Sequence, residues 1–297
     1  MKKSLIKDIP SQYINNVNKK KKINTGLLVT SIIFGIYAIS LLIPLLWGLM
    51  MSLQTRAQYI TDKLRFPIPP QFKNYAQAFV ELQGSGKGLV QMIFNSLWFS
   101  LGGTFFHVMT SICAAYACAK YKFFMNKIMY WISVITMMIP IMGSLPASLK
   151  LSVALGLYDN PMTLISSASA LGSTFVIAFA FFKGVSWEYA ESAFIDGASH
   201  IRVFFQIMLP QAISPIIALS ITGFIGSWND ATGPLVYLPS WPTLASGFYI
   251  YQIESARVLN YPVLFAGLFV AAAPIITLYM LFQNTLMDLQ IGGGMKG

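Results

Sequence analysis

The side chains of this chain that could carry out chemistry are few and scattered. His200 has no other metal-ligating residue at a useful spacing, and His107 lies in an apolar stretch where a hydrogen-bonded packing role is expected. Cys113 and Cys118 lie in the same apolar stretch, which is typical of packed thiols rather than a disulfide. No Ser/His/Asp or His/Cys grouping is present, so the sequence predicts no catalytic residue, no metal site and no cofactor.

One short segment imitates a phosphate-binding loop. Residues 84–88 read GSGKG, but Gly88 stands where a phosphate loop has Ser or Thr, and Glu81 stands where it has its first glycine. A turn is the better interpretation, and we expect no ATP site in this chain.

A single acidic residue lies close to an apolar run. Asp230 follows Trp228 and Asn229, and an acid inside a membrane is a functional candidate by default. Aromatic faces and amides suit hydroxyl-rich substrates, so these three residues are candidates for a pore or substrate contact. A purely structural role for Asp230, near a helix end, is an equal alternative.

The segment 187–215 predicts two short helices joined by a tight turn. Glu188 to Ile195 favours a helix with acids near its positive end, Gly197 suits a turn, and Ser199 can cap the next helix. An apolar stripe at helical spacing follows, and Pro210 ends it. The stripe consists of Ile201, Phe204, Phe205, Met208 and Leu209, opposite His200, Arg202 and Gln206. Such an element should dock against a membrane or a partner.

The elements that must position these residues are membrane helices. The chain has 56% hydrophobic and 10% charged residues, against about 25% charged in soluble proteins. Its long uncharged windows each exceed the roughly 20 residues of a membrane span. They cover residues 23–55, 88–119, 128–149, 160–182, 203–229 and 258–287. None alternates like a barrel strand, so the predicted class is an all-α polytopic membrane protein with six transmembrane helices.

The basic residues set the expected orientation. The net charge of +10 reflects membrane orientation rather than nucleic-acid binding. When successive helices cross the membrane in alternating directions, 13 of the 20 Lys and Arg residues fall on one side. Both termini are therefore expected in the cytoplasm. The expected helices cover residues 26–51, 89–119, 127–149 with breaks at Pro140 and Pro146, 161–183, from Pro215 to 237, and 262–286. A surface helix is expected near Tyr75 to Leu82 and an external loop at 239–262.

The segment after the fourth expected helix resembles the EAA loop of ABC importer permeases. The family pattern is EAA, three residues, Gly, nine residues and I-x-L-P, with Ser192 here replacing an alanine. Six residues stand at the matching positions: Glu191, Ala193, Gly197, Ile207, Leu209 and Pro210. The runs DGA at 196–198, GSWNDATGPLVYL at 226–238 and GGGMKG at 292–297 resemble the maltose-type smaller permease of carbohydrate importers.

This resemblance implies a type I ABC importer permease that forms half of the pathway for a carbohydrate, with an oligosaccharide as the expected class. It implies a cytoplasmic tail at 1–25, a first helix and external loop at 26–88, a permease core at 89–287 with the EAA loop at 187–210, and a cytoplasmic tail at 288–297. The EAA loop and the C-terminal tail would contact the ATPase, and the external loop around Trp241 to Tyr251 would contact the binding protein.

The implied partners are a second permease subunit, two ATP-binding subunits, an extracellular or periplasmic sugar-binding protein, and lipid of the bacterial plasma membrane. ATP hydrolysis would reside in those partner subunits. A stand-alone secondary transporter is the alternative, but it needs coupling acids in its helices, and the first four expected helices hold none. A membrane enzyme would need clustered titratable groups near one membrane face, and the sequence shows none.

Overall fold

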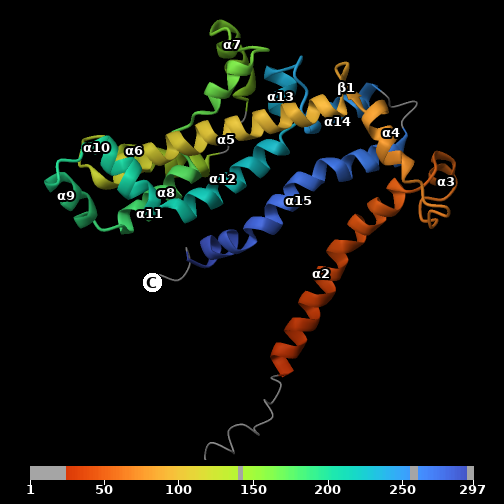
Figure 1. The fold of residues 1–297 in the computed structure, drawn as a ribbon, viewed down its shortest axis with the longest axis horizontal. Helices are drawn as coiled ribbons and strands as arrows, with labels where there is room; N and C mark the ends of the chain where they lie inside the picture. The colour runs from red at the N-terminus through yellow and green to blue at the C-terminus, as the bar shows by residue number, and fades with distance from the viewer. Residues whose placement is uncertain (1–24, 140–142, 255–259, 293–297) are drawn as a thin grey trace, which may run out of the picture.

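The structure, a computed structural model, describes residues 25–139, 143–254 and 260–292. These residues form helices and one two-stranded hairpin (Figure 1). The elements that precede residue 140 are α2 (Thr25–Ser52), α3 (Arg56–Thr61), α4 (Lys73–Glu81), β1 (Gln83–Gly84), β2 (Lys87–Gly88), α5 (Leu89–Lys120) and α6 (Asn126–Met138). The middle elements are α7 (Leu145–Ala154), the 3₁₀-helix η1 (Pro161–Ser167), α8 (Ser173–Gly184), α9 (Glu188–Ile195), α10 (His200–Val203), the π-helix η2 (Phe204–Met208) and α11 (Leu209–Gln211). The last are α12 (Ile213–Trp228), α13 (Thr232–Tyr237), α14 (Leu244–Glu254) and α15 (Tyr261–Gly292).

Three helices are long and apolar enough to cross a membrane unaided: Gly26–Ser52, Leu89–Lys120 and Tyr261–Asn284. A fourth candidate is the pair His200–Gln211 and Ile213–Trp228, which is bent by 79°. The all-α class is confirmed. Among the described residues, however, six uninterrupted spans are not found, because three of the expected helices are broken. The one expected from Pro215 to 237 ends as α12 at Trp228, and α13 begins only at Thr232.

The expected helix over 161–183 is divided by its own sequence. η1 ends at Ser167, and α8 begins only after Gly172, whose φ of +127° no right-handed helix can contain. In the serine-rich stretch between them, Ser169 O accepts a hydrogen bond from Ser111 Oγ on α5 at 2.7 Å, and Ser169 Oγ donates to Leu171 O at 3.0 Å. Serine competes with helical hydrogen bonding in this way, and the hydropathy of the stretch did not reveal it.

The expected helix over 127–149 is also divided, into α6 and α7. Pro140, one expected break, lies outside the described residues. Pro146 begins α7 in its first turn, where its missing N–H removes no helical bond, so it starts a helix rather than kinking one. Most of the expected tails at 1–25 and 288–297 also lies outside the described residues. Helix α15 extends to Gly292, so the expected C-terminal tail begins as helix.

The expected external loop at 239–262 contains a helix, α14. Its start is fixed by a reciprocal pair: Thr243 N donates to Ser246 Oγ at 2.9 Å, and Ser246 N donates to Thr243 Oγ1 at 3.3 Å. This is a capping-box arrangement with Ser in place of Glu or Gln. The Thr-x-x-Ser spacing at 243–246 was the sequence signal that could have predicted the start of this helix. The expected surface helix near Tyr75 is confirmed as α4.

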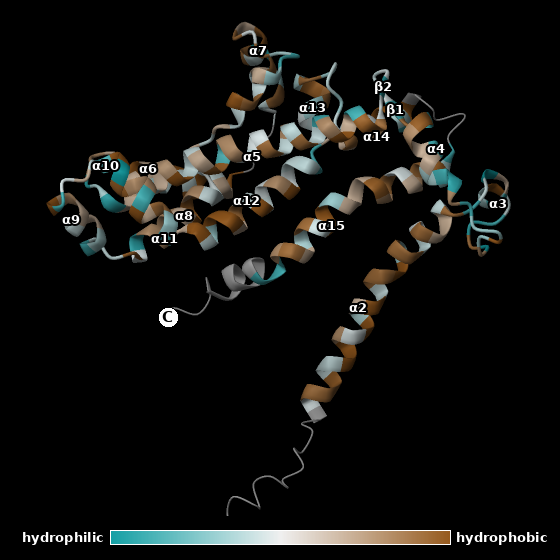
Figure 2. Ribbon diagram, in the orientation of Figure 1, coloured by the Kyte–Doolittle hydropathy of each residue, from teal (hydrophilic) through white to brown (hydrophobic). Residues whose placement is uncertain are grey.

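Long helices α5, α12 and α15 run side by side, while α2 leaves the bundle (Figure 1). Short elements gather at the two ends of the bundle. We call the end with α9, α10 and α11 the loop end, and the end with α3, α4 and the β1–β2 hairpin the hairpin end. Figure 2 shows α2 hydrophobic over most of its length and hydrophilic residues around α3 and α9–α10. This distribution is that of a chain solvated by lipid in the middle and by water at both ends.

The buried side chains form two clusters, one toward each end. The loop-end cluster joins α5, α8 and the α9–η2 segment, through residues such as Tyr116, Phe182, Ala193, Phe204 and Met208. The hairpin-end cluster joins α4, α5, α12, α14 and α15, through residues such as Leu82, Met92, Trp228, Phe248 and Val263. Helix α5 therefore links the two ends of the molecule.

Candidate functional site

The first helix of the loop end, α9, packs through small side chains. Ala190 and Ala193 are buried in the loop-end cluster, while Glu188 and Glu191 are exposed in its first turn. Carboxylates in that position are favoured by the helix dipole. The alanine of the sequence pattern therefore lies at the packing face, and the glutamate lies on the surface.

The turn after α9 is a Schellman motif centred on Gly197. Ala198 N donates to Ala193 O at 2.9 Å and Gly197 N donates to Phe194 O at 3.0 Å, which are the two bonds of that motif. Gly197 has a φ of +80°, and a Cβ placed on it would meet no atom within 4 Å. Glycine is thus required by the backbone conformation rather than by lack of space. The predicted turn is confirmed.

The second helix of the loop end begins and ends as its sequence dictates. Ser199 Oγ accepts from Arg202 N at 3.4 Å, which confirms the expected cap. Near the other end, Leu209 N donates to Phe204 O, five residues back, in the π-helical turn η2. Pro210 follows without an N–H, and the chain then bends by 79° into α12.

The apolar stripe of this helix is only partly as predicted. Phe204 and Met208 are buried and Leu209 is half-buried, but Ile201 and Phe205 are exposed. Ile201 and Phe205 are therefore the members of the stripe that stay open to a membrane or a partner, and the π-turn η2 begins at Phe204, within the stripe. Val203 takes the buried place, with no exposed surface.

An aromatic chain connects the loop end to α5. The ring of His200 lies 4.7 Å from that of Phe194 and 5.6 Å from that of Tyr121, the residue that ends α5. Tyr121 also contacts Trp187 edge-on at 5.7 Å, and its hydroxyl lies 2.9 Å from His200 Nδ1. These contacts join α5, α9 and α10 at one point.

The chain of rings continues into the core through Tyr116. That ring lies 4.8 Å from Phe204 and 5.5 Å from Phe182 on α8. Close to it, Lys120 Nζ donates to Val185 O in the chain that leads into α9. Sequence reasoning missed this cluster; the available signal was the aromatic and basic run at 120–124.

The outward face of the loop end mixes acids with large apolar groups. Tyr189, Ile195 and Ile201 are exposed, Ile195 by 86%, beside the carboxylates of Glu188 and Glu191. Exposed aliphatic groups of this size among charges are typical of an interaction surface. The arrangement can bind a partner, and it contains no group placed for catalysis.

The three pore candidates lie far along α12, toward the hairpin end. Trp228 is buried against Phe224, and its Nε1 donates to Ala271 O on α15 at 3.1 Å. Asn229 is exposed and donates to Ile225 O at 2.8 Å, within its own helix. Asp230 Oδ1 accepts from Gly233 N at 3.0 Å. The structure therefore does not bring these residues together with the loop end.

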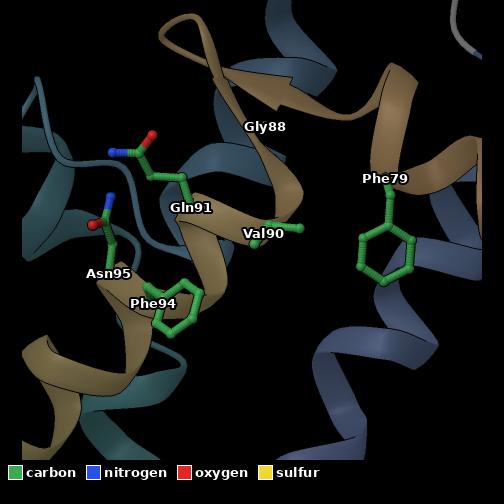
Figure 3. Close-up of a pocket in the computed structure, with 6 residues that line it drawn as sticks. All are labelled: Phe79, Gly88, Val90, Gln91, Phe94 and Asn95. Carbon is green, nitrogen blue, oxygen red and sulfur yellow. The ribbon is translucent and has the colours of Figure 1, made fainter.

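A cavity of about 510 Å³ opens near the start of α5 (Figure 3). It is lined by Phe79, Gly88, Val90, Gln91, Phe94 and Asn95. The Phe79 ring from α4 stands on one side, and the amides of Gln91 and Asn95 lie on the other side of α5 in this view. The Asn95 amide is already engaged, since its Nδ2 donates to Pro242 O at 2.9 Å. The cavity is an apolar depression at the hairpin end.

Two other expectations concern ligands and isolated side chains. His107 Nε2 lies 3.0 Å from Thr174 Oγ1, which confirms its packing role. The GSGKG segment forms a hairpin turn with Ser85 and Gly86 at positive φ, as predicted. Within the described ranges, no group of three or more His, Cys, Asp or Glu side chains could hold a metal ion.

A bundle of apolar helices with a compact, partly exposed two-helix element at one end is the architecture of a membrane protein that can bind a partner at that end. A sequence profile of the binding-protein-dependent transport system inner membrane component family matches residues 107–289, more than half of the chain. The chain belongs to this family. It is a multi-pass protein of the inner membrane and not an enzyme, and it works with a substrate-binding protein and separate ATPase subunits.

Several characterised relatives are similar over most of their length. The diacetylchitobiose uptake system permease protein NgcG of Streptomyces coelicolor is 26% identical over 84% of this chain and 82% of its own. The sulfoquinovosyl glycerol transport system permease protein SmoH of Agrobacterium fabrum is 27% identical, over 86% and 89%. The arabinooligosaccharides transport system permease protein AraQ of Bacillus subtilis is 26% identical, over 91% and 96%.

A solved structure has the same fold. One chain in the crystal structure of a bacterial ABC transporter involved in the import of the acidic polysaccharide alginate superposes with a TM-score of 0.71. The match covers 93% of this chain and 98% of that chain, with 19% sequence identity.

Proposed function

We propose that this chain forms half of the translocation pathway of a carbohydrate ABC importer, and that the loop end transmits ATPase closure to the helices. The observation that carries the proposal is the α9–α11 geometry. A rigid Schellman turn at Gly197 presents an exposed acidic and aliphatic face, while aromatic rings fasten its other side to α5. A partner that moves this face would move α5 with it.

The residues assigned to coupling have distinct roles. Glu191 lies on the contact surface, Ala193 allows close packing of α9, and Gly197 permits the turn. Ile207 and Leu209 pack against the loop-end cluster, and Pro210 begins the sharp bend into α12. The full set is Glu191, Ala193, Gly197, Ile207, Leu209 and Pro210.

The cargo class is inferred from the relatives. Their names concern a disaccharide, a sugar glycerol conjugate and oligosaccharides, which supports a carbohydrate, and an oligosaccharide in particular. Trp228, Asn229 and Asp230 are proposed to act near the pathway. Because Trp228 is held between α12 and α15, we assign it to shaping the pathway wall and leave Asn229 and Asp230 as the polar contacts.

The proposed assembly pairs this chain with a second, different permease, two ATP-binding subunits and an external sugar-binding protein. Both termini and the loop end are placed in the cytoplasm, as the distribution of Lys and Arg favours. The hairpin end and α14 then face the outside. Tyr249, exposed on α14, is the side chain best placed there to meet the binding protein.

The first test is purification of the tagged chain from its native membrane in mild detergent, followed by mass spectrometry. We expect an ATPase subunit and a second permease to accompany it. A chain that is recovered alone and transports in liposomes without ATP would instead be a secondary transporter. Orientation is tested separately, in a variant with Cys113 and Cys118 replaced by serine, by reaction of a Lys122→Cys substitution with an impermeant maleimide, which should occur only in inverted vesicles.

A further inference from the structure

Five large apolar side chains stand exposed together at the hairpin end. They lie between the last turn of α3 and the start of α4, and each has between 69% and 74% of its surface exposed. We call them the exposed apolar ridge: Ile60, Leu64, Phe66, Ile68 and Phe72. Single exposed apolar residues are common, but five within thirteen residues require a partner surface.

The ridge is held outward by a fixed backbone. Gln58 Nε2 donates to Ile68 O at 3.0 Å, and Gln71 N donates to Leu53 O at 2.8 Å. Gln54, which is fully buried, donates through Nε2 to Arg65 O. Since these bonds hold the backbone on both sides of Phe66, the exposure of the ridge belongs to the folded state.

The depth of the ridge is set by α2. Trp47, in the last turns of this spanning helix, donates through Nε1 to Lys63 O at 3.3 Å. At 1.5 Å per residue, Trp47 lies about 7–8 Å inside the helix end at Ser52. The segment therefore folds back beside α2, on the side away from α5 (Figure 1). The most apolar stretch of α2 has none of its residues buried, which is typical of a lipid-facing helix.

The polar groups around the ridge are mostly basic. Arg56, Lys63, Arg65 and Lys73 are all exposed in this segment. Its one acid, Asp62, is partly satisfied because Oδ1 accepts from Leu64 N at 2.9 Å. Apolar and aromatic side chains beside Lys and Arg, at the level of a tryptophan near a helix end, match the membrane interface.

We propose that the exposed apolar ridge inserts into the headgroup boundary of the leaflet at this end of α2, and that its basic residues select anionic phospholipid. In the orientation of the proposed function this is the outer leaflet. The ridge and the spanning helix together anchor the hairpin end at a fixed depth, so that movement at the loop end is not lost as tilting of the whole chain.

The test is photocrosslinking of the assembled complex in native membranes. p-Benzoylphenylalanine replaces Phe66 or Phe72 in two variants, and Tyr189 at the loop end in a third. We expect the probes at 66 and 72 to attach to phospholipid, identified by mass spectrometry, and the probe at 189 to attach to the ATPase subunit. The probe at 189 tests the proposed function, so its failure is distinguishable from failure of the ridge proposal.

Two results would overturn the proposal. One is attachment of the probes at 66 and 72 to a second permease or a binding protein. The other is no attachment at either position while the probe at 189 reacts, which would place the ridge in water. The charge selection is tested by Arg65→Gln with Lys73→Gln, against Lys87→Gln in the hairpin as the matched control. The double variant should lower the fraction of anionic phospholipid among the crosslinked lipids several-fold. An unchanged fraction would contradict the proposal that these basic residues select anionic phospholipid.

Discussion

The two ends of the bundle are held together by different interactions. At the loop end, rings from α5, α8, α9, α10 and η2 contact one another at edge-on or tilted angles, with the Tyr121–His200 contact as a polar link. At the hairpin end, buried amides and hydroxyls bond backbone atoms: Asn74 Nδ2 donates to both Ser52 O and Gln54 O at 2.8 Å, and Ser96 Oγ accepts from Leu244 N at 2.8 Å.

This difference suits different tasks. A hydrogen bond from a buried amide has a strict geometry, so it specifies one arrangement of the chains it joins. Aromatic contacts tolerate a range of angles while they keep their buried area. A loop fastened by rings can follow a moving partner without losing contact with α5, whereas the hairpin end remains fixed.

The largest expected effect comes from breaking the loop-end turn. Gly197→Val should abolish uptake, because a branched side chain at positive φ costs about 2 kcal/mol or more, and each 1.4 kcal/mol is about tenfold in an equilibrium. Uptake of labelled sugar in cells, with the amount of membrane-inserted protein measured in parallel, is the readout.

The matched control is Gly86→Val in the hairpin. Gly86 has a φ of +71° and equally open surroundings, so the backbone strain is similar but lies at the opposite end. We expect much of the uptake to remain in this variant. Equal loss in both variants would contradict a special role for the loop end.

The next effect is on stability at the hairpin end. Asn74→Ala leaves two carbonyls without their buried donor, at a cost of about 1–3 kcal/mol for each unsatisfied group. Thermal unfolding in detergent should show a clear decrease in Tm, with uptake retained at low temperature. Gln211→Ala, which removes an exposed amide bonded to Ile207 O at the loop end, should change stability by less than about 0.5 kcal/mol.

A smaller effect is expected from the polar link itself. Tyr121→Phe keeps the rings in contact but removes the hydroxyl facing His200, a loss of about 0.5–1.5 kcal/mol. We expect less sugar transported per ATP hydrolysed in proteoliposomes, with ATP affinity unchanged. Tyr37→Phe, on the exposed face of α2, is the control. An unchanged transport ratio in Tyr121→Phe would assign coupling to ring packing alone.

The smallest effect is expected at Asp230. Asn keeps an oxygen that can accept from Gly233 N, so Asp230→Asn should retain most uptake, while Asp230→Ala should lose a bond of about 0.5–1.5 kcal/mol. If the Asn and Ala variants instead reduce sugar affinity equally, the negative charge of Asp230, rather than its hydrogen bond with Gly233, is needed for transport. Uptake measured over a range of sugar concentrations separates these outcomes.

The sequence predicted the parts of the fold that depend on local rules. The spans α2, α5 and α15 followed from uncharged length, and the Gly197 turn and Ser199 cap followed from residue types that few other conformations use. The break before α8 was missed because hydropathy averages over Ser and Gly. Helix α14 was missed because its Thr243–Ser246 cap lies in a stretch rich in turn-forming residues.

Amino-acid order alone therefore determined the class of protein, the apolar spans and the docking element with its obligatory glycine. These follow from transfer of side chains to lipid and from backbone sterics, which act within a few residues. Tertiary structure decided which faces are buried. Val203 was buried while Phe205 stayed exposed, α15 accepted the hydrogen bond of Trp228, and Tyr121 met His200 from a distant part of the chain. Such contacts depend on how helices pack in three dimensions, and local periodicity does not encode that packing.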